Sequence, residues 1–249
     1  MLGPMMTSVV SWFAFLPIFI LVLISVGVRA IHFYLFEKKF HVSFADAPVY
    51  SLFYFSAWSA ILALLFPTLV HKLFSYVTLI DYLGVTFLLL IVFPALFHTT
   101  RKQSGRAEWL VRLSPGEGML TLGEQYILAK IGDVVFQQLV AGVMILSLMA
   151  NGVSYPVTVG IFVALFAAAH LYIFRTSGMF WGIYYTTYAS LGGFVFTFLI
   201  TFIRNGIAYA IVVHMLFYVL SGLLFAKMPR PAIKAFKNDL AGRGSSLTE

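Results

Sequence analysis

Seven long, nearly unbroken apolar stretches are the feature that most constrains the fold of this 249-residue chain. Each is expected to form one helix, and they cover residues 8–36, 49–70, 77–98, 126–150, 156–174, 179–203 and 207–225. A helix of about 20 apolar residues crosses the hydrocarbon core of a bilayer. A membrane β-strand needs only about 10 residues, with alternating polarity. The pattern therefore predicts an all-α, polytopic transmembrane bundle with about seven spanning helices.

The composition supports this class of protein. Hydrophobic residues make up 61% of the chain and charged residues only 10%, whereas an average soluble domain is about 25% charged. The chain contains no cysteine, so disulfides and cysteine-ligated metals are excluded. The net charge is +7, but the basic residues lie mostly between the apolar stretches, where they meet lipid head groups. Membrane lipids are therefore expected partners, and nucleic acid is not.

The distribution of basic residues predicts the orientation. With the N-terminus outside, twelve lysines and arginines fall on the inner side: Lys38, Lys39, Arg101, Lys102, Arg106, Arg112, Arg175, Lys227, Arg230, Lys234, Lys237 and Arg243. Only Lys72 and Arg204 fall on the outer side. Cytoplasmic loops carry the excess of positive charge, so the C-terminus is expected in the cytoplasm. Arg29 and Lys130 lie within helix ends and are expected to extend to the inner interface.

The longest connection between apolar stretches suggests how the chain is organised. We expect a three-helix transmembrane segment at 1–98, a cytoplasmic or interfacial loop at 99–125, a four-helix core at 126–226 and a basic cytoplasmic tail at 227–249. Within the loop, residues 106–113 mix charged residues with tryptophan and leucine. This mixture is typical of a helix lying on the membrane surface.

Ionisable residues deep in the apolar stretches are the candidates for a functional site, because charge is costly in a bilayer. Three are deep: Asp133, His170 and His214. We expect them to face one cavity in the last four helices, with Gln137, Gln138 and Tyr218 near them. The alternative is purely structural, since a single histidine in a membrane helix often makes an interhelical hydrogen bond.

The order and spacing of these residues resemble the CPBP family of intramembrane proteins. That family includes CAAX prenyl endopeptidases and bacteriocin-processing or immunity proteins. Its first motif, Glu-Glu-x-x-Phe-Arg, is similar to residues 132–137. Its Phe-x-x-x-His motif matches Phe166 to His170, and its His-x-x-x-Asn motif matches at His214. The resemblance covers roughly residues 126–225 and implies a membrane-embedded peptidase site.

The departures from the family pattern weaken the implied chemistry. Gly132 stands where the family has the glutamate taken to activate water, and Gln137 replaces the motif's arginine. Tyr218 replaces the asparagine, although a tyrosine hydroxyl can still donate to an oxyanion. Asp133 is then the remaining candidate base, with His170 and His214 orienting water or stabilising the oxyanion.

Zinc is the only cofactor that these side chains suggest, because two histidines and a carboxylate can form a zinc set. The chain has no His-Glu-x-x-His signature, so a metal-free site is favoured and no cofactor is expected.

The sequence thus predicts an integral membrane protein, in a bacterial or archaeal plasma membrane, that resembles CAAX-type endopeptidases. Its substrate would be a membrane-anchored peptide or protein, and its peptide hydrolysis is expected to be weakened or lost. Two alternatives remain open. One is a non-catalytic binding, immunity or chaperone-like protein. The other is a small transporter or sensor, for which discontinuous helices and repeat symmetry would be expected. A retinal protein is excluded, because 206–225 contains no lysine.

Overall fold

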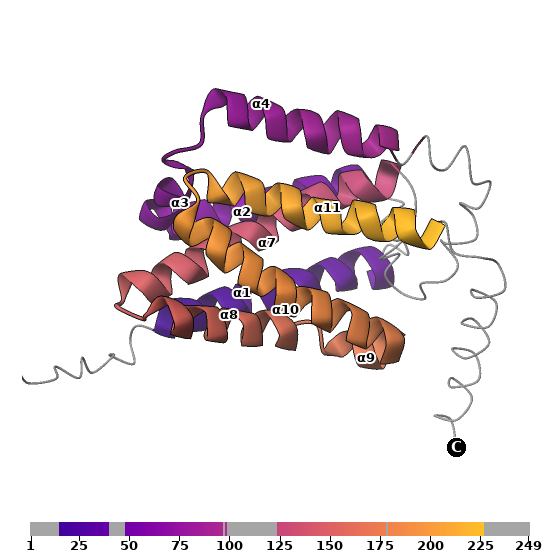
Figure 1. Cartoon of the computed structure of the whole chain (residues 1–249). Coiled ribbons are helices and arrows are strands. Elements are labelled where there is room, and N and C mark those ends of the chain that lie inside the picture. The colour runs from indigo at the N-terminus through magenta and orange to yellow at the C-terminus, as the bar shows by residue number, and fades with distance from the viewer. Residues whose placement is uncertain (1–14, 40–47, 97, 99–123, 178, 227–249) are drawn as a thin grey trace, which may run out of the picture.

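The computed structural model describes residues 15–39, 48–96, 98, 124–177 and 179–226, and every regular element in these ranges is helical. The helices are α1 (Leu16–Phe33), α2 (Pro48–Leu65), α3 (Pro67–Phe74), α4 (Leu79–Phe87), α7 (Glu124–Ala150), α8 (Tyr155–Ala168), α9 (Tyr172–Ser177), α10 (Met179–Phe202) and α11 (Gly206–Ala226). Two π-helical segments, η2 (Tyr34–Lys39) and η3 (Leu88–Val92), continue α1 and α4. The long helices lie side by side as a bundle (Figure 1).

Five of the described helical stretches are long and apolar enough to cross a membrane: Pro48–Leu65, Leu79–Leu96, Ile127–Ala150, Tyr155–Phe174 and Gly182–Phe202. Two shorter apolar helices, Leu16–His32 and Gly206–Ser221, accompany them. The predicted all-α fold is therefore confirmed for the described residues, and five of the seven predicted spans have the length and hydropathy of a membrane crossing. The surface helix expected at 106–113 and the tail at 227–249 lie outside them.

Two of the expected helices are interrupted. The helix predicted at 49–70 is wrong as a single element, because α2 ends at Leu65 and α3 begins at Pro67. A proline disfavours helical backbone in the residue before it, and Phe66 has φ −128° and ψ 53°. The helix predicted at 156–174 is also divided, since a turn at 169–171 separates α8 from α9. His170 therefore lies in a turn and not inside a helix.

A short turn joins the helices predicted at 126–150 and 156–174. After α7 ends, the backbone N–H of Val153 donates to the carbonyl of Leu148 (3.1 Å), and that of Gly152 donates to Met149 (3.0 Å). These two bonds are the Schellman arrangement, which needs a left-handed residue after the helix. Gly152 supplies it with φ +80°. This turn sends α8 back along α7, and because α8 has 14 residues against the 27 of α7, its end lies beside the middle of α7.

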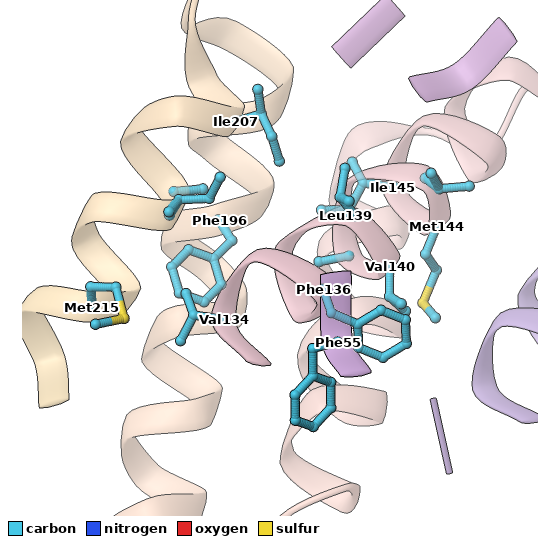
Figure 2. Close-up of a cluster of buried hydrophobic side chains, with 14 of the residues drawn as sticks. Phe55, Val134, Phe136, Leu139, Val140, Met144, Ile145, Phe196, Ile207 and Met215 are labelled. Carbon is cyan, nitrogen blue, oxygen red and sulfur yellow. The ribbon is translucent and has the colours of Figure 1, made fainter. Parts of the chain in front are cut away.

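The core of the bundle is centred on α7. In an 18-residue window of its Ile127–Ala150 stretch, 89% of the residues are buried inside the protein. The helix packs most extensively against α2 and also contacts α1, α3, α8, α10 and α11. Figure 2 shows apolar side chains of α7 gathered with others from neighbouring helices, such as Phe55 and Met215. Because protein surrounds α7, its polar side chains can be satisfied without meeting lipid.

Candidate functional site

A buried carboxylate with two cationic partners lies near the start of α7. Asp133 is 1% exposed. Nζ of Lys130, one helical turn earlier, donates to its Oδ2 (2.9 Å), as residues three apart share one helix face. From α1, Nη2 of Arg29 donates to Oδ1 (2.7 Å). Both carboxylate oxygens of Asp133 are therefore engaged in ion pairs.

The ion pair and burial of Lys130 correct the expectation that this side chain extends to the interface. Lys130 is only 5% exposed, and the side chain of Arg29 is 37% exposed. A lone charge is expensive at low dielectric, whereas a paired and hydrogen-bonded charge is tolerated. The three-residue spacing of Lys130 and Asp133 could have indicated their pairing. Nothing local in the sequence indicates Arg29, which is 104 positions away from Asp133.

Contacts between α1 and α2 hold Arg29 in place. His32, one turn further along α1, is buried and its Nε2 lies 3.2 Å from Oγ of Ser51 on α2. The hydroxyl of Tyr54 donates to the carbonyl of Val28 (2.7 Å). These polar contacts flank Arg29 in the chain and fix α1 against α2. They thereby set the position from which the guanidinium reaches Asp133.

His170 uses one ring nitrogen to complete the turn between α8 and α9. Its backbone N–H donates to Ala167 (2.9 Å), and its Nδ1 lies 2.7 Å from the carbonyl of Phe166. A carbonyl oxygen can only accept, so Nδ1 carries the proton and Nε2 of the neutral ring has a lone pair. Nε2 has no hydrogen-bond partner among the described residues. His170 thus presents an acceptor.

His214 is held in the complementary state. Nε2 of Gln138 on α7 lies 2.7 Å from Nδ1 of the buried ring. An amide nitrogen only donates, so Nδ1 accepts and the proton of the neutral ring is on Nε2. The ring stacks on Tyr218 (5.5 Å between centroids) and packs beside Phe196 (5.2 Å). His214 thus presents a donor.

Two neighbouring cavities meet at three side chains: Phe166, His170 and Tyr218. The smaller cavity, about 170 Å³, lies between α8, α10 and α11, and His214 also lines it. The larger, about 330 Å³, lies between α1, α7 and α8, and Gln137 lines it.

The structure therefore brings His170, His214 and Tyr218 to one cavity. Gln137 joins His170 and Tyr218 at the other cavity. Asp133 lines neither of the two. It is connected to them through Arg29, which lines the larger cavity, and through Lys130, whose Nζ lies 5.1 Å from the centroid of the Tyr218 ring.

Gly132, the position of the family's water-activating glutamate, faces α2. A Cβ at this position would lie 3.1 Å from both Cα and the carbonyl oxygen of Leu52. A side chain at 132 would be crowded by the backbone of α2, which would have to shift by a few tenths of an ångström to accept even a Cβ. The position that holds the water-activating glutamate in the CPBP family is therefore turned toward the backbone of α2 in this chain.

Among the described residues, no group of three or more His, Asp or Glu side chains is arranged to hold a metal ion. Comparison of the chain with protein-family models, with curated proteins and with solved structures gave no match. The fold and the site together define a polytopic helical membrane protein. It has a buried charge cluster beside two cavities.

Proposed function

We propose that this protein is a CPBP-type membrane protein that binds a membrane-associated peptide in the smaller cavity, with peptide hydrolysis weak or absent. The observation that carries the proposal is the position of Asp133 between Arg29 and Lys130. A general base must accept a proton from water within hydrogen-bonding distance. A carboxylate whose two oxygens are both bound to cations is poorly suited to that task.

The two histidines support the binding part of the proposal. A peptide group has one N–H donor and one C=O acceptor. In the smaller cavity, the Nε2 lone pair of His170 can accept from the peptide N–H, and Nε2–H of His214 can donate to its carbonyl. A preorganised pair of this kind recognises an amide without needing any acid or base step.

The proposed topology has seven crossings, with the N-terminus outside and the C-terminus in the cytoplasm. Besides the five long stretches, α1 has 18 residues and α11 has 21. At about 1.5 Å per residue they extend roughly 27 and 32 Å, which is close to the ~30 Å hydrocarbon core. A reporter enzyme fused after Leu240 should behave as cytoplasmic. Activity of the reporter only on the outer side would overturn this topology.

The test of function uses purified protein and a fluorescent, prenylated CAAX peptide. We expect binding without appreciable cleavage, and about tenfold weaker binding for His214→Phe, which keeps the ring stack but removes the donor. His71→Phe is the matched control, because His71 is exposed on α3. Cleavage by the wild type that is lost in Asp133→Asn would overturn the proposal and make Asp133 a catalytic base. If His214→Phe bound the peptide as tightly as the control His71→Phe, the proposed peptide site would be ruled out.

A further inference from the structure

We infer that the larger cavity is a binding site for a single-chain phospholipid with an anionic head group, such as lysophosphatidylglycerol. The cavity lies between α1, α7 and α8, beside the smaller cavity, and the two share Phe166, His170 and Tyr218 in their linings. Its lining is divided along the bundle axis. That division, more than its volume, indicates the class of ligand.

The polar lining residues gather at one end of the bundle. Arg29 lies near the end of α1, Gln137 is in the first half of α7, His170 follows the end of α8, and Tyr218 is in the second half of α11. Because α7 runs antiparallel to the other three helices, these positions are at similar depth. The polar end therefore combines guanidinium, amide, imidazole and phenol groups.

The opposite end of the cavity is apolar. Moving from Gln137 along α7, the lining residues are Val140, Ala141 and Met144. In the antiparallel direction, Val22 lies before Arg29 on α1 and Phe162 lies before His170 on α8. Ser25, between Val22 and Arg29 on α1, is the one polar lining residue on this side. A cavity with most of its polar groups at one end and mainly apolar groups at the other fits an amphiphile, with its chain along the helices.

The chemistry of the polar end selects the head group. Arg29 already has Nη2 on Asp133, and a guanidinium with five N–H donors can bind a phosphate oxygen as well. Of the two cavities, Gln137 lines only this one, and its amide oxygen can accept from a glycerol hydroxyl. A volume of about 330 Å³ is at the small end of the range for ligand sites, which favours one acyl chain over two. Lysophosphatidylglycerol supplies all three features.

The test measures lipid bound to the full chain in phosphatidylcholine nanodiscs by native mass spectrometry. Lysophosphatidylglycerol is compared with a monoacylglycerol of the same chain, which has the hydroxyls but no phosphate. We expect the wild type to prefer the phospholipid by about tenfold or more, the value of one charge-assisted hydrogen bond. Equal retention of the two lipids would overturn the inference.

Two variants separate the head group from the chain. Arg29→Gln should abolish the preference between the two lipids. Ser25→Phe, which fills the cavity from α1 without touching the ion pairs, should reduce binding of both by about tenfold or more. Ser56→Phe is the matched control, because Ser56 is exposed on α2 and lines neither cavity. Unchanged binding in Ser25→Phe would overturn the inference even if Arg29→Gln fails to fold. Loss of peptide binding alone would leave this lipid site intact.

Discussion

Hydropathy alone predicts that α7 and α4 are both ordinary membrane spans, yet α7 is buried inside the bundle and α4 is exposed at its edge. The Leu79–Leu96 stretch that begins with α4 is the more apolar of the two, and only 11% of its residues are buried inside the protein. In an 18-residue window of Ile127–Ala150, 89% of the residues are buried. Figure 1 shows α4 at the top margin of the bundle and α7 among the other helices. Most side chains of α4 face outward from the bundle, where lipid would surround them, whereas those of α7 contact other helices. The less apolar span is therefore the central one.

The two helices also place their polar residues differently. In α4, Asp81 lies in the first turn, where it forms a capping box with Thr78 and accepts from Asn205 (2.7 Å). In α7, Lys130, Asp133 and Gln138 are buried, and each bonds a side chain. A polar residue at a helix end satisfies backbone groups. A polar residue within a span needs a partner from another helix or the next turn.

The sharpest difference between the two helices should be the cost of breaking the ion pairs of α7. Asp133→Leu leaves Lys130 buried without its carboxylate, and removing one partner of a buried pair costs about 3–5 kcal/mol of unfolding free energy. Adding Lys130→Met should recover most of the loss, because two apolar side chains need no partner. The measurement is reversible unfolding in detergent–SDS mixtures, followed by circular dichroism. If the double variant were no more stable than Asp133→Leu, the ion pair would stabilise the fold by more than neutralising two buried charges.

A second comparison uses one glycine from each helix. Gly132→Ala places a methyl group 3.1 Å from backbone atoms of Leu52, whereas a Cβ on Gly84 of α4 meets nothing within 4 Å. Overpacking typically costs about 1–3 kcal/mol, so Gly132→Ala should be destabilising. Gly84→Ala should be neutral or stabilise by up to about 1 kcal/mol. The same unfolding experiment measures both. Equal effects on stability would indicate that α2 moves aside easily. The close contact between α7 and α2 would then contribute little to stability.

The smallest expected effect is the coupling between Gln138 and His214. A double-mutant cycle with Gln138→Leu and His214→Phe should give a coupling free energy of about 0.6 kcal/mol, and no more than roughly 1.7, as for hydrogen bonds in other membrane bundles. Its contribution would be mainly to orient the ring. A coupling near zero would mean that stacking on Tyr218 and Phe196 suffices to hold His214, and the proposed donor at Nε2 would lose its support.

Many of the individual site residues could be predicted from the sequence, but the hydrogen bonds and ion pairs that link them could not. The apolar stretches and the deep positions of Asp133, His170 and His214 are readable, because charge in a span is rare and costly. The hydrogen bond between Gln138 and His214, which are 76 positions apart, could not be predicted from the sequence. Nor is the role of Arg29, whose place near a helix end is equally compatible with reaching the interface. The function, substrate and orientation stay predictions.

What the sequence determined by itself is the class of structure, since an apolar chain of this length has to form backbone-satisfied helices in lipid. Gly152 and Pro67 also act locally on the backbone, at the turn after α7 and at the break at Phe66, although that break was not predicted. Only the tertiary structure decided which span is central, which cations engage Asp133, and that Gly132 faces the backbone of α2. These outcomes depend on contacts between distant segments, and no local pattern encodes the face that a helix turns toward its neighbours.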